Sequence, residues 1–161
     1  MRPFLIAAML SVFSAGAALA QPPMAQPPLA PSPLGEWAVE NGEAHIRIVS
    51  CGTGLWGVIS WTKGPPGTDE NNPDPAKRTR SMLGVPILLN LQPGQNRWEG
   101  EVYNAENGET YNSNISLVSA DQLRIQGCVL GGLICGGETW TRAPSAPGAP
   151  KDQAVCSGLA K

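Results

Sequence analysis

Hydrophobic and polar residues alternate along several short stretches of the chain. Ala44, Ile46 and Ile48 would share one face of an extended segment, and His45 and Arg47 would lie on the other. Alternation with a period of two is typical of antiparallel strands that have one buried and one solvated face. The pattern predicts eight strands, at Glu36–Glu40, Ala44–Ser50, Leu55–Thr62, Val85–Leu91, Arg97–Asn104, Thr110–Ser119, Gln122–Val129 and Glu138–Arg142.

Short connections join most of these stretches. Asn41-Gly42 and Asn107-Gly108 are typical hairpin turns, and residues 63–80, here called the lid, form the one long connection. A meander of eight strands closes most simply into an antiparallel up-and-down barrel, because closure leaves no unpaired edge. A two-sheet sandwich is the alternative. The interior of an eight-stranded barrel is either filled by side chains or holds one small ligand.

The two ends of the chain lie outside this pattern. Residues 1–20 read as a secretory signal with an Ala-x-Ala cleavage site ending at Ala20, and the run is short and badly flanked for a membrane anchor. Residues 21–33 contain six prolines and predict an extended linker. The barrel domain then spans 34–142, and 143–161 predict a flexible tail. We expect a periplasmic or secreted protein without a membrane span in the mature chain.

Composition narrows the function classes. Charged residues make up 15% of the 161 residues and the formal net charge is −2, so the basic surface of a nucleic-acid-binding protein is not expected. His45 is the single histidine, which excludes a multi-histidine metal site within one chain. Glu99 and Glu101 share a strand face but would need a sheltered face for acid–base work. No Gly-x-Ser-x-Gly motif occurs, and we predict no catalytic residue and no cofactor.

A series of short motifs runs along nearly all of residues 35–142. They are Gly35-Glu36-Trp37, Leu55-Trp56-Gly57-Val58-Ile59-Ser60-Trp61, Asp69 with Asn72-Pro73-Asp74-Pro75, Arg78-Thr79-Arg80, Leu83-Gly84, Trp98-Glu99-Gly100, Tyr103-Asn104, Asn107-Gly108-Glu109-Thr110-Tyr111 and Thr139-Trp140-Thr141-Arg142. In joint order and spacing they resemble a family of small secreted bacterial proteins, domain of unknown function 2147. The resemblance implies a lipocalin-like β barrel in the periplasm or outside the cell, and no established activity. Family members often carry a cysteine near position 56, where this chain has Trp56.

Four cysteines remain after the predicted cleavage, and export favours disulfides, for which three pairings exist. A Cys128–Cys135 bridge would staple a hairpin, whereas a redox pair would have Cys-x-x-Cys spacing. Cys51 lacks the neighbour that family members have, and the tail should leave the barrel at the end where Cys51 lies. We therefore predict a Cys51–Cys156 bridge; a free, exposed Cys156 is the alternative.

The lid carries the densest set of chemically useful side chains. Oxygen ligands at Asp69, Asn72 and Asp74 could hold calcium, but the loop lacks the glycine and the terminal glutamate of an EF-hand. We expect instead that the carboxylates pair with arginines of the same loop, and predict no metal. Arg78 and Arg80 could also present their guanidinium groups to an anionic ligand.

Aromatic side chains bear on what the interior does. Trp61, Trp98 and Tyr111 are expected to face inward, where they either fill the core or line a cavity. The leading hypothesis is a non-catalytic barrel that binds a small, partly apolar ligand at its mouth, which the lid, both Asn-Gly turns and the Cys128–Cys135 loop should surround. A filled barrel that serves as an envelope or extracellular protein-interaction module is the alternative, and an enzyme is third.

Closure of the barrel predicts one specific contact. Antiparallel pairing of the first and last strands brings Trp37 and Arg142 to the same end, where the missing side chain of Gly35 lets the large ring fold across the base. An arginine beside an indole can stack on its face. Lipocalins have a similar Gly-x-Trp and late-strand arginine, so the resemblance agrees that these three residues are structural.

Overall fold

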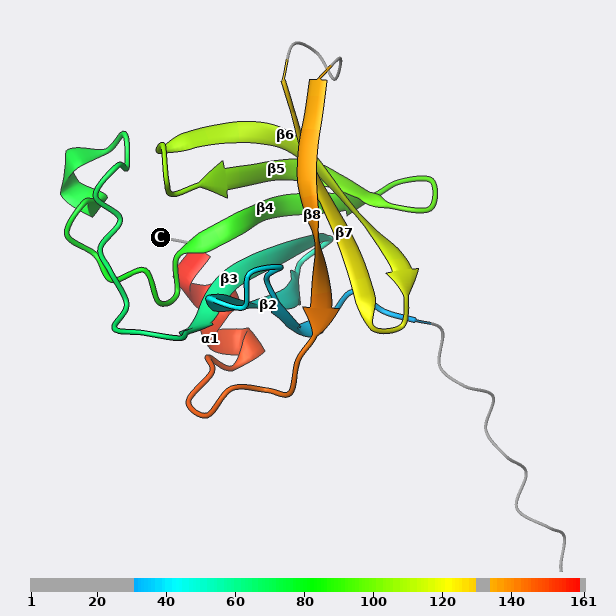
Figure 1. Cartoon of the computed structure of the whole chain (residues 1–161), viewed down its shortest axis with the longest axis horizontal. Helices are drawn as coiled ribbons and strands as arrows, with labels where there is room; N and C mark the ends of the chain where they lie inside the picture. The colour runs from blue at the N-terminus through cyan, green and yellow to red at the C-terminus, as the bar shows by residue number, and fades with distance from the viewer. Residues whose placement is uncertain (1–30, 130–133, 160–161) are drawn as a thin grey trace, which may run out of the picture.

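The computed structural model describes residues 31–129 and 134–159, which form a closed barrel of eight antiparallel strands in sequence order (Figure 1). The strands are β1 (Gly35–Ala38), β2 (Ala44–Cys51), β3 (Gly54–Thr62), β4 (Pro86–Pro93), β5 (Trp98–Asn104), β6 (Glu109–Ser119), β7 (Gln122–Val129) and β8 (Ile134–Arg142). The predicted up-and-down barrel is confirmed, and the sandwich is wrong. The predicted signal with its cleavage site at Ala20, and most of the linker, lie outside the described residues.

Most strand boundaries agree with the alternation to within a few residues, and β8 is the exception. It begins at Ile134, four residues before the predicted start at Glu138. The reason is the ladder of the β7–β8 hairpin, in which Cys128 pairs with Cys135 and Val129 with Ile134. Two glycines in this added stretch hide its strand character in the sequence.

The barrel closes where Trp37 of β1 pairs with Arg142 of β8. The guanidinium carbon of Arg142 lies 4.1 Å from the centroid of the Trp37 ring, which is fully buried. The same guanidinium donates hydrogen bonds to the carbonyl oxygens of Leu34 (3.0 Å), Ser32 (2.7 Å) and Ala120 (2.8 Å). Arg142 thus joins the first strand, the last strand and the β6–β7 turn, and the predicted contact with Trp37 is confirmed.

Gly35 makes room for this contact. Its φ of 111° lies in the region that side chains rarely adopt, and an added Cβ would come within 3.3 Å of Nη1 of Arg142. Trp37 is held from the other side, because its indole N–H donates a hydrogen bond of 2.7 Å to the carbonyl oxygen of Pro33. Both observations support the structural role predicted for Gly35 and Trp37.

The hydrophobic core packs inside the barrel and includes the buried ring at this closure. Trp98 packs partly buried against this core, so it helps to fill the base. The buried core residues are Trp37, Ile46, Ile48, Leu55, Ile59, Val85, Leu88, Leu91, Tyr103, Ile115, Leu123, Ile125 and Trp140.

A bulge in β3 corrects the expectation for Trp61. Ile46 pairs with Ile59 whereas His45 pairs with Trp61, which leaves Ser60 as the extra residue. A bulge shifts the alternation, and Trp61 therefore shares the outer face with His45; their ring centroids lie 4.6 Å apart. Trp61 is a surface partner of the histidine, and its expected position in the interior is wrong.

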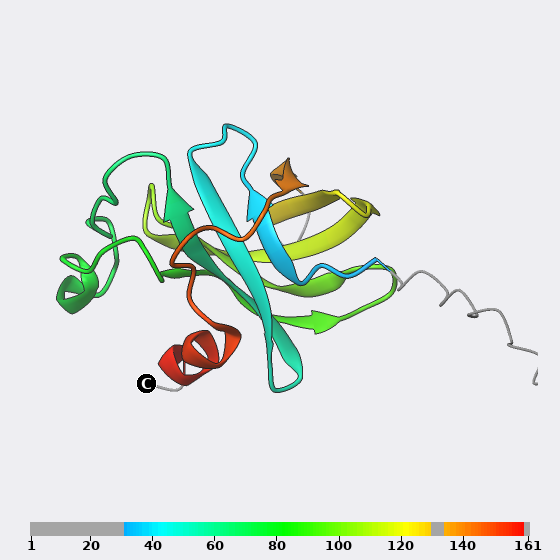
Figure 2. The same cartoon turned by 90° about the horizontal axis from the view of Figure 1, so that it is seen from below.

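The C-terminal tail, expected to be flexible, contains helix α1 (Asp152–Leu159), which lies outside the barrel beside the β2–β3 hairpin (Figure 2). The Cys51–Cys156 disulfide joins the helix to the end of β2, as predicted. Val155 is buried against Val49 and Val58 on the outer face of the sheet. The prediction of a flexible tail is wrong because these apolar contacts and the disulfide together fix the helix.

Ion pairs also attach helix α1 to the barrel. Arg47 lies between two carboxylates, with Nη2 at 2.8 Å from Asp152 of the helix and Nη1 at 3.3 Å from the buried Glu36 of β1. Ser60 also donates a hydrogen bond to Glu36. The bulged residue of β3 therefore contributes to the polar contacts under the helix. Within the described residues, no helix is long and apolar enough to cross a membrane.

Replacing Arg142 tests the closure. We expect Arg142→Ala to lower the free energy of unfolding by about 2 kcal/mol, because it removes a cation–π contact and charge-assisted hydrogen bonds. Arg97→Ala is the matched control, since Arg97 pairs with Glu99 at an exposed site and should cost no more than about 0.5 kcal/mol. Urea denaturation followed by tryptophan fluorescence measures both, and equal losses would contradict this account of closure.

The two disulfides should differ in their effect on stability. Cys51–Cys156 spans 105 residues and Cys128–Cys135 spans 7. Loop-closure entropy predicts that replacing the first pair by serine costs about 4.8 kcal/mol and replacing the second about 2.5 kcal/mol. Denaturant unfolding of the two double variants gives the comparison, and a larger loss in the hairpin variant would refute it.

Candidate functional site

One end of the barrel is open and is surrounded by four connections. The β1–β2 turn, the lid, the β5–β6 turn and the β7–β8 hairpin lie at this end, and the β4–β5 and β6–β7 turns at the other (Figure 1). Asn41, Ala105 and Ile134 each line the opening from a different one of these connections. The lid and the hairpin thus share one mouth, as the alternation of loops in an up-and-down barrel predicts.

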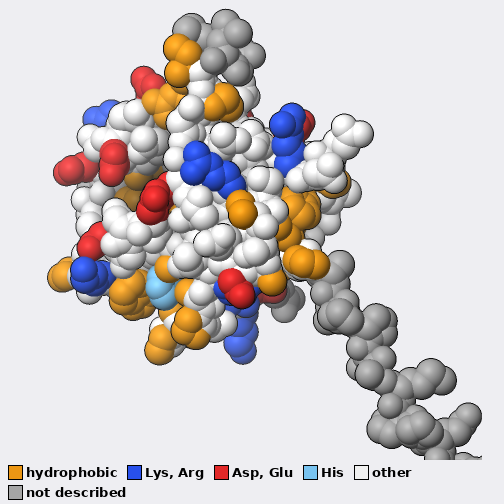
Figure 3. Space-filling view, turned by 45° about the vertical axis from the view of Figure 1, so that its right-hand side comes forward, with side chains coloured by type: hydrophobic (Ala, Val, Ile, Leu, Met, Phe, Trp, Pro, Cys, Tyr) orange, Lys and Arg blue, Asp and Glu red, His pale blue; other side chains and the backbone are white. Residues whose placement is uncertain are grey.

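A cavity of about 650 Å³ opens at this mouth. It lies within the range of about 300–1,000 Å³ that is usual for small-molecule sites. Most of its walls are apolar, and the exposed side chains of Val129 and Ile134 line it at the ends of β7 and β8. Figure 3 shows hydrophobic side chains gathered toward the top of the view. The aliphatic side chains that line it include Val39, Ile46, Ile59, Val102, Ile125 and Ile134.

Three aromatic residues also line the cavity, namely Tyr103, Tyr111 and Trp140. Tyr111 was expected to face inward, and the structure places it there. Its hydroxyl donates to Glu109 (2.8 Å) and accepts a hydrogen bond from Asn107 (2.7 Å). The hydrogen bond to Glu109 raises the pKa of Tyr111 above its ordinary value.

Glu138 is the polar group that the sequence analysis missed. It lies opposite Ile125 in the β7–β8 ladder, and its half-buried carboxylate lines the cavity. The indole N–H of Trp140 donates a hydrogen bond to Oε1 of Glu138. The sequence contained a signal that Glu138 faces the interior. Glu138 and Trp140 are two residues apart on one strand and therefore share a face, and Trp140 is buried.

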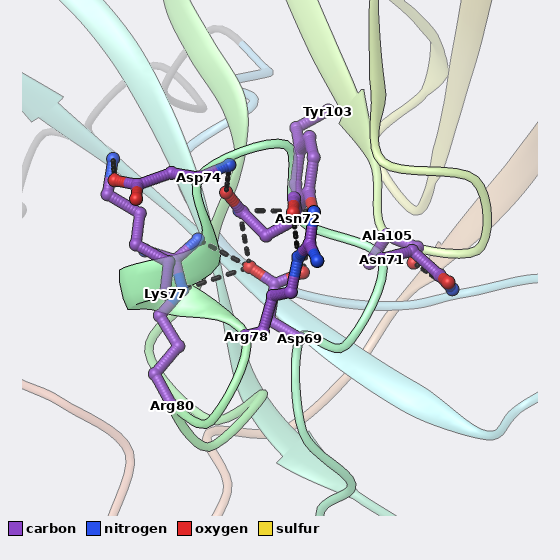
Figure 4. Close-up of polar contacts among 9 residues, drawn as sticks. All are labelled: Asp69, Asn71, Asn72, Asp74, Lys77, Arg78, Arg80, Tyr103 and Ala105. Carbon is purple, nitrogen blue, oxygen red and sulfur yellow. Dashed lines mark hydrogen bonds and ion pairs between the residues drawn. The ribbon is translucent and has the colours of Figure 1, made fainter.

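The lid is fastened by a buried carboxylate (Figure 4). Asp69 is fully buried, and the Tyr103 hydroxyl donates to its Oδ1 at 2.5 Å. Its Oδ2 accepts hydrogen bonds from Asn72 (2.8 Å) and from Nη2 and Nε of Arg80 (2.7 and 3.0 Å). Asp69 therefore ties both arms of the lid to a barrel residue that lines the cavity.

The protonation of Asp69 reflects these contacts. Burial by itself would raise the pKa of the carboxyl group, but hydrogen bonds from Tyr103, Arg80 and Asn72 outweigh it and hold the pKa below its ordinary value. Burial raises the pKa of the Tyr103 hydroxyl, as does its hydrogen bond to Asp69. At neutral pH the pair consists of a carboxylate and a neutral phenol.

Other lid residues shape the loop and seat it on the barrel. Asn71 donates hydrogen bonds to the carbonyl oxygens of Ala105 (3.3 Å) and Glu106 (2.9 Å) in the β5–β6 turn. At Gly108, which has a φ of 74°, an added Cβ would overlap the carbonyl oxygen of Asn71. The Asn107-Gly108 turn thus provides close contact with the lid as well as the reversal of the chain.

The remaining predicted lid residues are also engaged within the loop. Asp74 caps the short 3-10 helix η1 (Pro75–Lys77) by accepting a hydrogen bond from the amide of Ala76 (3.0 Å). Nε of Arg78 donates to the carbonyl oxygen of Asn72 (2.8 Å). The expectation that lid carboxylates pair with lid cations agrees with this geometry. None of the five lid residues predicted as ligand contacts lines the cavity; these are Asp69, Asn72, Asp74, Arg78 and Arg80.

Comparison with known proteins agrees with the fold. Residues 35–142 match the family described as uncharacterized protein conserved in bacteria, DUF2147. Protein HP1028 from the human pathogen Helicobacter pylori, described as belonging to the lipocalin family, is similar in structure with a TM-score of 0.65 and 20% sequence identity. The likeness covers 71% of this chain and 85% of that protein. No curated protein matches the sequence.

The lid contact gives a pH-dependent prediction. We expect Asp69→Asn to lower the free energy of unfolding by about 2 kcal/mol at neutral pH, because buried donors lose a charged acceptor. The pKa of Asp69 is lowered in the folded state, so its contribution is complete above the unfolded pKa of about 3.9 and is lost as the pH falls through the folded pKa.

Denaturation of both proteins between pH 7 and pH 2 measures this effect. The difference between wild type and Asp69→Asn should shrink at the acid end. Glu70→Gln is the control, because Glu70 is exposed next to Asp69 in the same loop, so its curve should follow that of the wild type. A difference that does not change with pH would show that the Asp69 charge contributes nothing.

Proposed function

This chain belongs to the bacterial family DUF2147, and we propose that it is an exported carrier or sensor barrel that binds a small, mainly apolar ligand in its open mouth. The observation that carries the proposal is the cavity of about 650 Å³ with its largely aliphatic and aromatic walls. A site of this volume can take up a small organic molecule and remove most of its apolar surface from water.

The architecture supports binding in a second way. The base is closed by the buried Trp37 and the core above it, while the mouth is left open. A rigid closed end and an open end bordered by loops form the usual arrangement for a binding site in a β barrel. An interaction module with a filled barrel would need the volume at the mouth to be occupied by side chains, and the cavity argues against that alternative.

The chemistry of the mouth favours binding over catalysis. The carboxylate of Asp69 is hydrogen-bonded to Tyr103, Asn72 and Arg80, so it cannot reach a bound substrate without breaking the lid contact. The cavity wall contributes the Glu138 carboxylate, with Trp140 as its hydrogen-bond donor. A half-buried carboxylate with an indole partner can orient a ligand, and the other carboxylate that lines the cavity, Glu106, is exposed in the β5–β6 turn rather than sheltered for acid–base chemistry.

Export is supported by the cysteines. Cys51–Cys156 and Cys128–Cys135 are both disulfides, and such bonds persist in the periplasm and outside the cell. The signal-like sequence that ends at Ala20 points to the same compartment. We propose cleavage after Ala20.

Filling the cavity tests the proposal. Gly136 lines the cavity, and an added Cβ there would meet no atom within 4 Å, so Gly136→Trp places an indole in open space. Titration with the neutral fluorescent probe N-phenyl-1-naphthylamine should give a saturable signal with the wild type. The affinity should fall by about tenfold or more in Gly136→Trp, because the added ring occupies the probe's apolar volume.

Thr141→Trp is the matched control, since Thr141 is exposed on the outer face of the same strand. It should bind the probe like the wild type. Absence of saturable binding by the wild type, or equal loss of affinity in both variants, would overturn the proposed function. If the wild type binds the probe, mass spectrometry of small molecules that copurify with the mature protein identifies the natural ligand class.

A further inference from the structure

We infer that the ligand of this cavity is an organic cation, a positively charged nitrogen attached to an apolar body, and that Glu138 binds the charge. This inference rests on the proposed function and specifies the chemical class of the ligand. Its basis is the combination of a half-buried carboxylate, three aromatic rings and aliphatic walls around the same cavity.

The charge of the cavity wall has one sign. Among the described residues that line it, Glu106 and Glu138 are the charged ones, and lysine, arginine and histidine do not occur. Glu106 is exposed in the β5–β6 turn, whereas Glu138 is half-buried in the wall formed by β8. A ligand that enters the cavity therefore meets a negative charge at the rim and another one inside.

Glu138 is left without a cationic partner in the described part of the chain. Its hydrogen-bond donor is the neutral indole N–H of Trp140, and Ile125 lies opposite it in the ladder. A carboxylate among apolar side chains loses hydration, and a single neutral donor compensates for only part of that loss. A bound cation would supply the rest, and the low dielectric constant of the cavity would strengthen the attraction.

Three cations near the mouth are already paired with carboxylates, and Arg78 of the lid does not line the cavity. Arg80 bonds to Asp69 at 2.7 Å, and Lys63 lies 3.0 Å from Glu43. Lys77 forms a third pair within the lid, at 3.4 Å from Asp74. These pairs occupy the side chains that could otherwise neutralise the cavity or attract an anion. The anionic ligand considered for the lid arginines therefore finds a poorer site than a cation would.

The aromatic walls favour the same class of ligand. Tyr103, Tyr111 and Trp140 present rings to the cavity from β5, β6 and β8. The face of an aromatic ring attracts a cation, indole most strongly, and the attraction grows when water is excluded. Because Trp140 also donates its N–H to Glu138, its ring and the carboxylate are held next to each other. Aliphatic side chains such as Ile46 and Ile59 then contact the apolar body.

The test uses three competitors that share one alkyl chain and differ in charge. Decyltrimethylammonium, 1-decanol and decanoate are each titrated against wild-type protein loaded with N-phenyl-1-naphthylamine, below their micelle concentrations. We expect the cation to displace the probe at a concentration about tenfold lower than decanoate, with decanol between them.

Glu138→Gln separates the charge from the shape. The amide oxygen of glutamine can still accept the Trp140 N–H, so the fold and the binding of decanol should be preserved. The variant should bind decyltrimethylammonium about tenfold more weakly than the wild type does. Glu101→Gln removes a carboxylate from an exposed position on β5 that does not line the cavity, and it should leave all three affinities unchanged.

The outcomes distinguish the two proposals. If the probe does not bind to the wild type, the proposed function fails and the inference fails with it. If the probe binds but decanoate displaces it as well as or better than the cation, the inference is wrong while the binding function stands. An equal loss of cation affinity in Glu138→Gln and Glu101→Gln would mean that general surface charge, rather than Glu138, attracts the ligand.

Discussion

The barrel depends on the contact that joins its first and last strands. β1 and β8 share only two residue pairs, Trp37 with Arg142 and Ala38 with Thr141, so the backbone ladder there is short. Arg142 compensates by stacking on Trp37 and bonding to carbonyl oxygens before β1 and in the β6–β7 turn. A single long side chain thus supplies the contacts that a longer ladder would otherwise provide, and β1 and β8 each gain a second neighbouring strand only because this joint exists.

Closure at the base leaves the mouth free to be hollow. Trp37, one of the largest buried side chains, fills the base, whereas Trp140 and the aliphatic wall residues border the cavity at the mouth. Asp69 performs the corresponding task at the other end, where it fixes the lid to Tyr103 through short hydrogen bonds. The lid is therefore anchored to a residue that also contacts the cavity, which couples the loop's position to the shape of the site.

Much of this fold could be predicted from the sequence because the interactions that determine it are local or follow from the order and direction of the strands. Alternation and Asn-Gly turns fix strands and hairpins, and antiparallel closure alone brings Trp37 to Arg142.

The predictions that failed have a different origin. Trp61 was misplaced because one bulged residue, Ser60, reverses the alternation. Helix α1 was missed because Val155 finds its partners, Val49 and Val58, about a hundred residues away. Glu138 was overlooked although it begins a predicted strand, because no local pattern shows that the face it shares with Trp140 borders a cavity.

The disulfide between Cys51 and Cys156 has a consequence for the order of events during synthesis. Its two sulfur atoms come from the end of β2 and from the last turns of the chain, 105 residues later. A chain that is synthesised from its N-terminus presents Cys51 first, and 105 further positions must follow before the partner arrives. In that interval Cys51 is a free thiol beside an incomplete sheet, while Cys128 and Cys135 appear together. The bond can therefore form only after every strand of the barrel and the helix that carries Cys156 have been synthesised.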